Sequence, residues 1–454
     1  MPSRRPFAGP NRQRFRLALL ALVGVLLLWT SYIVLEGGVS TRILGVRVSS
    51  RDEWRPLAAA LILAAAYGAL ARRAAFEDFT WILERIRSGA TLLAVVVALC
   101  AGATAAAWGT KAASGADSYG YISQADLWLQ GRLIVSLPVM ADLDLPNSNS
   151  ALAPHGYRPG PEANTLVPTY APGLPMFMAG FKALFGACGV YLVVPAFTVL
   201  LVFATYDLGR SFGSRFEGLA AALLVACSPI IIRMSLLPMT DVPVAATWTA
   251  AIAVTAGALG PNRGATQRVA ALASAGALTA LTILIRPNLV PLAPVIAGAV
   301  LADARASRES SRSAMSALVL FGAVAATGAL FVAGYNAYLY GSPCRTGYGE
   351  GMFRLAHVMP NLQRYPRWLV HSQTAAVALA VVPLVGRWLG SPARLPKESL
   401  VLLYGTIAVT LISYIPFLVF EEWWYLRFLT PAIPAITVAM VVGGRWLLGV
   451  LVGR

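Results

Sequence analysis

One short stretch of this chain combines residue types that acid–base chemistry requires. Residues 115–129 read GADSYGYISQADLWL, and they follow an apolar run and precede a long polar segment. Asp117 and Tyr121 are four residues apart, so their side chains share one face if the stretch is helical. A partly desolvated carboxylate can take a proton from an attacking hydroxyl group. We therefore predict that Asp117 is a general base and that Tyr121 contacts the substrate.

A structural role is the alternative for both acids of this stretch. Aspartate is a favoured N-cap residue, so Asp117 would in that case cap a helix over residues 118–134. A cap would also fix the direction of the side chain, so capping and catalysis are compatible. Asp126 fits an exposed position on the same helix, and we expect it to be solvated.

The composition is that of an integral membrane protein. Hydrophobic residues make up 57% of the chain and charged residues 12%, and the mean hydropathy is +0.67. Soluble domains carry about 25% charged residues. The net charge of +16 is scattered between apolar runs, which indicates membrane topology and anionic lipid, and no nucleic-acid partner. The sequence contains no phosphate-binding loop and no dinucleotide fingerprint, and its cysteines and histidines are too dispersed for a metal cluster.

Two ionisable residues interrupt apolar sequence close to prolines. Asp241, in PMTDVP, either caps a helix that starts at residues 242–243 or faces the same cavity as Asp117. In that cavity it would be a metal ligand or a contact to a sugar hydroxyl, so a divalent cation stays open although no resident cofactor is predicted. Arg286, in LTILIRPNLVPLAP, either snorkels to the membrane interface or binds a phosphate through paired hydrogen bonds.

Two later segments add candidate substrate contacts. Arg345 and Tyr348 lie in the arginine-rich segment 341–371, whose arginines contact either lipid headgroups or a lipid-linked phosphate. The stretch FEEWWYLRFLTPAIPA contains the other candidates, which are Glu421, Tyr425 and Arg427. Its aromatic residues form either an ordinary aromatic belt or a stacking surface for a sugar or a prenyl chain. An acid of this stretch, Glu421 or Glu422, could also neutralise Arg427.

Apolar runs near 20 residues long predict about twelve membrane-spanning helices. Basic residues follow alternate runs, as at Arg85, Arg87, Arg210 and Arg215, and by the positive-inside rule they mark the cytoplasmic side. The basic N-terminus and the C-terminus are then both cytoplasmic. The apolar part of residues 173–185 is too short to cross, and we predict a re-entrant or interfacial helix there. The predicted spans are 17–35, 56–71, 89–108, 188–208, 218–237, 242–259, 269–285, 288–302, 315–338, 372–390, 399–418 and 429–447.

This threading places all the candidate residues on the outer side of the membrane. The long outer loop 109–172 carries Asp117 and amphipathic helical segments. We divide the chain into N-terminal helices with a cytoplasmic loop (1–88), a transmembrane catalytic core (89–435), and a helix end with a tail (436–454). The predicted fold is therefore an all-α membrane protein with amphipathic or re-entrant helices in its first long outer loop.

Taken in order, these motifs resemble the GT-C superfamily of membrane glycosyltransferases, in particular its bacterial aminoarabinose-transferase and protein O-mannosyltransferase branch. The resemblance implies a polyprenyl-phosphate-sugar donor, chemistry at the outer membrane surface, and a catalytic role for Asp117. Many members have an Asp-Glu pair at that position, whereas this chain has Asp117-Ser118. The motifs that carry the resemblance are GADSYGYISQADLWLQGRL, YAPGLPMFMAGF, LLPMTDVPVAA, LIRPNLVPLAP, YNAYLYGSPCRTGYG and WWYLRFLTPAIPA.

The sequence thus predicts a bacterial inner-membrane glycosyltransferase. It would move a sugar from a polyprenyl phosphate to a hydroxyl of a glycan, lipid or protein, with inversion at the anomeric carbon. Arg286, Arg345 and Arg427 would stabilise the leaving phosphate. The alternatives are a multi-span transporter or flippase for a lipid or sugar, which the proline-broken helices also fit, and a non-catalytic scaffold.

Overall fold

A computed structural model describes most of the chain, in the ranges 10–43, 46–71, 74–140, 148–259, 264–307, 310–349, 351–388 and 395–451. The predicted sides of the two termini concern residues 1–9 and 452–454, which lie outside the described residues. The chain divides into two compact units, residues 1–89 and residues 90–454, and the division falls inside one long helix.

The first unit is a helical hairpin with a strand hairpin at its turn. Its elements are α1 (Pro10–Glu36), β1 (Val39–Ile43), β2 (Val46–Ser50), α2 (Trp54–Ala71) and the start of α3 (Ala75–Trp108). The strands pair antiparallel with Val39 opposite Ser50, and the sequence analysis did not predict them. Arg16 donates two hydrogen bonds, of 2.6 and 2.9 Å, to the buried carboxylate of Asp78. This charge pair fixes α1 against the start of α3.

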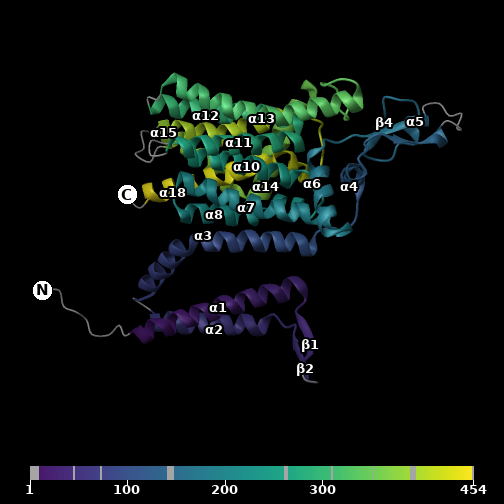
Figure 1. Cartoon of the computed structure of the whole chain (residues 1–454). Coiled ribbons are helices and arrows are strands. Elements are labelled where there is room, and N and C mark those ends of the chain that lie inside the picture. The colour runs from purple at the N-terminus through teal and green to yellow at the C-terminus, as the bar shows by residue number, and fades with distance from the viewer. Residues whose placement is uncertain are drawn as a thin grey trace. The chain divides into compact units, whose positions relative to one another are not determined.

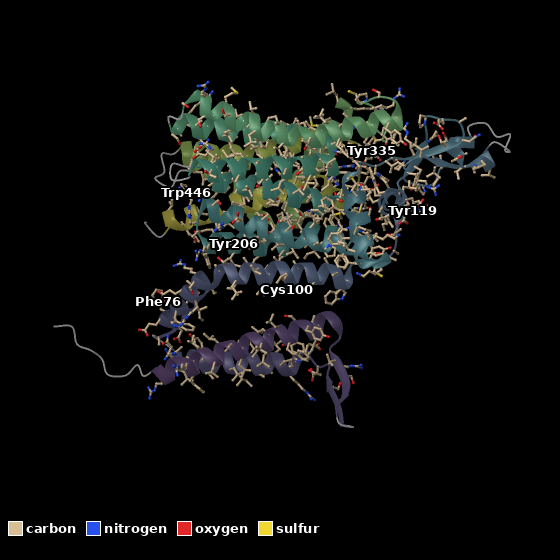
Figure 2. The ribbon with its side chains drawn as sticks, viewed as in Figure 1. Phe76, Cys100, Tyr119, Tyr206, Tyr335 and Trp446 are labelled. Atoms are coloured by element: carbon tan, nitrogen blue, oxygen red, sulfur yellow. The ribbon has the colours of Figure 1, made fainter. Side chains whose placement is uncertain are left out.

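The second unit is a bundle of helices that lie side by side (Figure 1). Helix α10 lies at its centre, and nearly all of its side chains are buried. Apolar side chains fill the space between the helices, with Tyr206 of α7 among those fully buried (Figure 2). The bundle helices are the rest of α3, α7 (Val193–Phe212), α8 (Arg215–Ala226), α9 (Pro229–Ser235), α10 (Asp241–Ala258), α11 (Ala265–Ile285), α12 (Ala293–Ala306), α13 (Ser311–Tyr340), α15 (Val382–Trp388), α16 (Lys397–Leu400), α17 (Thr406–Tyr414) and α18 (Ile433–Leu451).

Short 3₁₀ segments lead into several of these helices. Proline explains one of them, because Pro287 and Pro291 lack the backbone N–H that a continuing α-helix needs. The helix α11 therefore ends at Ile285, and Arg286 becomes its C-cap residue in an extended conformation. These segments are η3 (Ala187–Leu192), η4 (Pro287–Leu292), η6 (Ala375–Val381) and η8 (Trp423–Ala432).

The described residues contain eight helices that are long and apolar enough to cross a membrane, or ten if each of two bent pairs is one span. The bent pairs are α8 with α9, at 63°, and the segment 355–373 with 375–386, at 110°. Of the remaining predicted spans, 242–259 coincides with α10, and 399–418 is divided by a π-helix at Val401–Gly405. The multi-span helical architecture is confirmed, whereas the count of about twelve spans is not.

The described residues of 109–172, which the sequence predicts to be an outer loop, fold against one end of the bundle (Figure 1). The helix predicted over 118–134 is found as α4, but it begins earlier and ends at Leu129. Helix α6 has 13 residues and is too short to cross a ~30 Å hydrocarbon core, as predicted. A small antiparallel sheet in the order β3-β5-β4 follows α4. The elements at this end are α4 (Gly115–Leu129), β3 (Val135–Ser136), η2 (Pro138–Met140), α5 (Ser148–Ala151), β4 (Tyr157–Pro159), β5 (Thr165–Pro168), α6 (Gly173–Phe185), η5 (Leu355–His357) and α14 (Val358–Gln373).

Candidate active site

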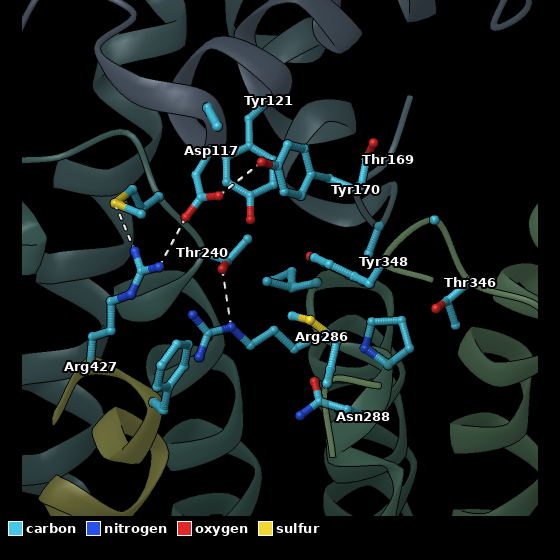
Figure 3. A pocket seen from close by; sticks show the side chains of 18 of the residues that line it. Asp117, Tyr121, Thr169, Tyr170, Thr240, Arg286, Asn288, Thr346, Tyr348 and Arg427 are labelled. Atoms are coloured by element: carbon cyan, nitrogen blue, oxygen red, sulfur yellow. Dashed lines mark hydrogen bonds and ion pairs between the residues drawn. The ribbon is translucent and has the colours of Figure 1, made fainter. Parts of the chain in front are cut away.

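A cavity of about 920 Å³ opens at this end of the bundle, between segments far apart in the sequence. Figure 3 shows part of its lining. Its walls come from the start of α4, residues 169–171, the end of α9, the junction of α11 with η4, the end of α13, residues 346–349 and 351–353, and the run from α17 to η8. Charged, hydroxyl and aromatic side chains all line this cavity.

Asp117 lies in the first turn of α4 and is held by two donors. The guanidinium of Arg427 lies 3.0 Å from its Oδ2 atom, and the Tyr170 hydroxyl donates a 2.8 Å hydrogen bond to its Oδ1 atom (Figure 3). The N-cap residue of α4 is Ser114, so the alternative that Asp117 caps this helix is wrong. A negative charge in the first turn of a helix is nevertheless favourable. The two donors therefore fix the direction of this carboxylate, whose side chain is 31% exposed.

Close packing fixes the position of Tyr170. A Cβ atom at Gly120 would lie 2.3 Å from the Tyr170 ring, so only glycine lets α4 approach this closely. The ring also contacts Tyr121, with centroids 4.7 Å apart. Tyr335 donates a 3.0 Å hydrogen bond to the Tyr170 carbonyl. Burial, together with the charge of Asp117, raises the pKa of Tyr170, so its hydroxyl stays a donor.

Arg427 is surrounded on several sides. Its guanidinium lies over the rings of Tyr425 and Phe428, at 5.5 and 5.2 Å from their centroids. Its Nη1 atom lies 3.4 Å from the sulfur of Met239, as Figure 3 shows. Its Nε atom is buried and has no hydrogen-bond partner among the described residues. The arginine therefore keeps one donor free for another ligand.

A second acid–arginine pair lies deeper. Asp241 is the first residue of α10, whose N-cap is Thr240, so the predicted cap is displaced by one residue. Its carboxylate is fully buried and pairs with Arg286. Arg286 also donates a 3.1 Å hydrogen bond to the Thr240 hydroxyl, while its Nη1 atom has no partner among the described residues. Burial alone would lower the pKa of Arg286, but the facing carboxylate of Asp241 outweighs this and raises it.

Next to Arg427 lies a cluster of stacked rings that we call the aromatic wall. Phe420 and Tyr425 stack with centroids 3.8 Å apart, and Tyr414 stacks on Phe428 at 5.3 Å. Arg233 lies over the ring of Trp424 at 4.6 Å. The aromatic wall consists of Tyr414, Phe417, Phe420, Trp424, Tyr425 and Phe428, all of which line the cavity.

Helix α14 supports the backbone of this aromatic wall. The chain after α17 is not helical, so several carbonyl groups lack helical partners. Asn361 donates hydrogen bonds of 3.0 and 2.7 Å to the carbonyls of Ile415 and Phe417. Tyr365 donates one of 3.3 Å to the carbonyl of Tyr414. The side chains of α14 thus replace the missing backbone donors and set the position of the wall.

The structure brings most predicted site residues to the cavity. Those that line it are Asp117, Tyr121, Arg286, Tyr348, Tyr425 and Arg427, and Asp241 lies behind Arg286. Arg345 is exposed and donates to the Tyr340 carbonyl at 3.4 Å, outside the lining. Glu421 is 89% exposed and faces Arg364 at 3.9 Å, so the expectation that Glu421 or Glu422 neutralises Arg427 is wrong. Asp126 is 40% exposed, as predicted for a solvated residue, but it pairs with Lys182.

Several lining residues were not predicted from the sequence. Tyr170 precedes the Pro172-Gly173 turn, and an aromatic residue before a helix start gave no distinct signal. Thr240 lies next to Asp241, and the proximity of Arg286 to both becomes visible only in the fold. The other lining residues that were missed include Arg233, Asn288, Asn336, Tyr414 and Phe417.

The described residues contain no group of three or more histidine, cysteine or acidic side chains that could hold a metal ion. Around Asp117 the reason is visible, because both of its oxygens already accept bonds from Tyr170 and Arg427. An arginine therefore supplies the positive charge beside this carboxylate.

The fold and the cavity define a multi-span helical membrane protein with an ion-paired carboxylate at one end of its bundle. Residues 169–330 match the family described as dolichyl-phosphate-mannose-protein mannosyltransferase. This match confirms the resemblance to the GT-C membrane glycosyltransferases. The matched segment includes Asp241 and Arg286, whereas Asp117 and Arg427 lie on either side of it.

Solved structures with a similar arrangement share little sequence with the chain. ArnT from Cupriavidus metallidurans in the apo state is 14% identical, with a TM-score of 0.49 over 80% of this chain and 63% of ArnT. The same enzyme bound to undecaprenyl phosphate is 13% identical, with a TM-score of 0.47 over 82% of this chain and 63% of that one.

The oligosaccharyltransferase of Archaeoglobus fulgidus, tethered with an acceptor peptide, is 12% identical, with a TM-score of 0.49 over 81% of this chain and 50% of that one. The chain thus spans between half and 63% of the lengths of these proteins. No curated protein matches it by sequence.

Proposed function

We propose that this protein transfers a sugar from a polyprenyl-phosphate donor to a hydroxyl group of an acceptor. The observation that carries the proposal is the ion pair of Asp117 with Arg427 in a cavity that is also lined by a cluster of aromatic rings. The family match supports the donor class, because dolichyl-phosphate mannose is itself a polyprenyl-phosphate sugar.

Asp117 is the general base in this proposal. It takes the proton of the acceptor hydroxyl while that oxygen forms a bond to the anomeric carbon of the sugar. The bond between this carbon and the phosphate oxygen breaks, and its electron pair stays on the phosphate. A single displacement of this kind inverts the anomeric centre. Tyr170 and Arg427 hold the carboxylate in a fixed position at the cavity, as this role requires.

The two arginines bind the phosphate. Arg286 and Arg427 each have one buried nitrogen without a partner among the described residues, and both line the cavity. Guanidinium groups form strong charge-assisted bonds with phosphate oxygens. The aromatic wall beside Arg427 suits the first isoprene units of the lipid, because its rings stack on one another and present an apolar surface. Tyr121 and Tyr348 lie near Asp117 and would contact the sugar or the acceptor.

The membrane placement follows from the charge pattern between the spans. The cavity end of the bundle faces outward, both termini are cytoplasmic, and the membrane is the bacterial inner membrane. We assign the catalytic core to residues 89–435, with residues 1–88 and 436–454 outside it. The acceptor is a glycan, lipid or protein.

The test is transfer by the purified full chain from synthetic polyprenyl-phosphate sugars, comparing the wild type with Asp117→Asn. The wild type should form a glycosylated product and polyprenyl phosphate, and the variant should lose roughly 10²–10⁴-fold in rate. Asp126→Asn is a matched control, because Asp126 pairs with Lys182 and does not line the cavity. Full activity of a folded Asp117→Asn protein contradicts the role of this residue, and uptake of free sugar without a transfer product identifies a transporter instead.

A further inference from the structure

We propose that Arg427 changes its electrostatic partner during the reaction, from Asp117 to the leaving lipid phosphate. Acceptance of the proton and departure of the phosphate are then coupled through one guanidinium group. This inference rests on the proposed function and adds a role that neither the resemblance nor the family match assigns. It begins from the geometry of the ion pair, in which Nη2 of Arg427 lies 3.0 Å from Oδ2 of Asp117.

The charge of Arg427 is compensated before the reaction. Its guanidinium is 17% exposed, and the facing carboxylate supplies one negative charge. Arg286, the other buried arginine of the cavity, is compensated in the same way by Asp241. These two pairs are therefore close to neutral while the donor, a phosphodiester with one negative charge, is bound.

The chemical step moves one charge across the cavity. Asp117 becomes neutral when it takes the acceptor proton, so Arg427 loses its compensating charge. The donor phosphate becomes a monoester at the same moment and carries roughly −1.5 to −2 at neutral pH. The negative charge that disappears from Asp117 thus reappears on the phosphate. Arg427 can therefore pair with Asp117 before the step and with the phosphate after it, if the phosphate lies within its reach.

Arg427 is built to serve both partners without moving far. Its stem and plane are held by Met239 and by the rings of Tyr425 and Phe428, so the guanidinium keeps its place. A guanidinium has five N–H donors in a rigid fork. The Asp117 carboxylate uses Nη2, and the buried Nε atom has no partner among the described residues. That nitrogen is the one we assign to the phosphate.

This arrangement makes a prediction that a purely structural ion pair does not. Replacing the base by a neutral residue should abolish transfer and yet strengthen binding of the product, because Arg427 is then free for the phosphate. The experiment measures the affinity of the purified full chain for farnesyl phosphate, with uncharged farnesol as the reference ligand. Asp117→Asn should bind farnesyl phosphate roughly tenfold or more tightly than the wild type, the size of one charge-assisted hydrogen bond. Farnesol should bind both proteins equally.

Double substitution separates this mechanism from simple repulsion between Asp117 and the phosphate. In an Arg427→Met background, Asp117→Asn should bring no gain, whereas Arg427→Lys should keep part of it because the positive charge is retained. A gain of equal size without the arginine overturns the proposal, as does unchanged or weaker binding by Asp117→Asn. Asp126→Asn, whose pair with Lys182 lies away from the cavity, should bind like the wild type.

The proposed function can fail independently of this inference. If Asp117→Asn gains affinity only with Arg427 present, Arg427 is shown to exchange Asp117 for a bound lipid phosphate, even when the proposed function fails because no transfer from a polyprenyl-phosphate sugar is found. If the wild type transfers sugar but Asp117→Asn gains no affinity for farnesyl phosphate, the proposed function is supported and the proposed change of partner by Arg427 is wrong. Thermal melting of each variant identifies a protein that has not folded. If Arg427→Met does not fold, Arg427→Lys is used in its place.

Discussion

The guanidinium of Arg427 lies 3.0 Å from the carboxylate of Asp117, although the two residues are 310 positions apart in the chain. One comes from the first turn of α4 and the other from η8, so the ion pair joins two segments from distant parts of the chain. In the proposed mechanism, the pair places the base next to a cation that can hold the phosphate. This proximity is what a single displacement at a lipid-linked sugar requires.

Tyr170 should be a positioning residue for Asp117. Tyr170→Phe removes the 2.8 Å hydrogen bond and keeps the ring, so the rate should fall roughly tenfold. The loss should appear in kcat more than in KM, because the carboxylate loses the donor that fixes its direction. No alkaline limb of the rate–pH profile should come from Tyr170, because burial raises its pKa. Tyr119→Phe is the control, since Tyr119 is 40% exposed. Figure 2 labels this residue. Equal kcat values for the two variants would exclude the role.

Gly120 should be required for the site although it carries no functional group. A methyl group there would lie 2.3 Å from the Tyr170 ring, so Gly120→Ala must displace Tyr170 or α4. We expect a loss of about 1–3 kcal/mol in the free energy of unfolding, typical of overpacking, and a lower transfer rate. Gly180→Ala in α6 is the matched control, because no atom lies within 4 Å of its Cβ position. Equal melting temperatures and rates for the two variants would contradict the packing argument.

The aromatic wall should depend on α14. Asn361→Ala removes two donors from the carbonyls of Ile415 and Phe417, which costs about 1–3 kcal/mol for buried groups left unpaired. The melting temperature should fall, and KM for the polyprenyl donor should rise more than kcat falls, because in the proposed mechanism the wall contacts the lipid whereas Asp117 acts on the acceptor. Gln363→Ala, on the exposed face of the same helix, should change neither quantity. A fall in kcat without a rise in KM would contradict the assignment of the aromatic wall to lipid binding.

Chelation of divalent cations should leave transfer unaffected. Both oxygens of Asp117 are engaged by Tyr170 and Arg427. One oxygen of Asp241 has no partner among the described residues, but this carboxylate is fully buried against Arg286, whose positive charge repels a cation. After treatment with EDTA the rate should change by less than about twofold. A loss of activity that Mg²⁺ or Mn²⁺ restores would show that a cation displaces one of these bonds.

The sequence by itself determined the class of protein and several of the stretches that meet at the candidate site. A membrane-spanning helix can be predicted from the length and apolar composition of a local run. The helices around 56–71, 269–285 and 288–302 could therefore be placed from composition alone. Charged residues are costly in such a chain, and this made Asp117 and Arg427 visible as candidates. The motif order also carried the resemblance that the family match confirmed.

Only the tertiary structure decided which of these charges meet. Sequence proximity suggested Glu421 or Glu422 as the partner of Arg427, but Asp117 occupies that position from the far end of the chain. Ion pairs between helices depend on how the helices pack in the bundle, and local sequence patterns do not predict this packing. The same reason explains why Arg345 lies outside the cavity and why Tyr170, held against Gly120, became visible only in three dimensions.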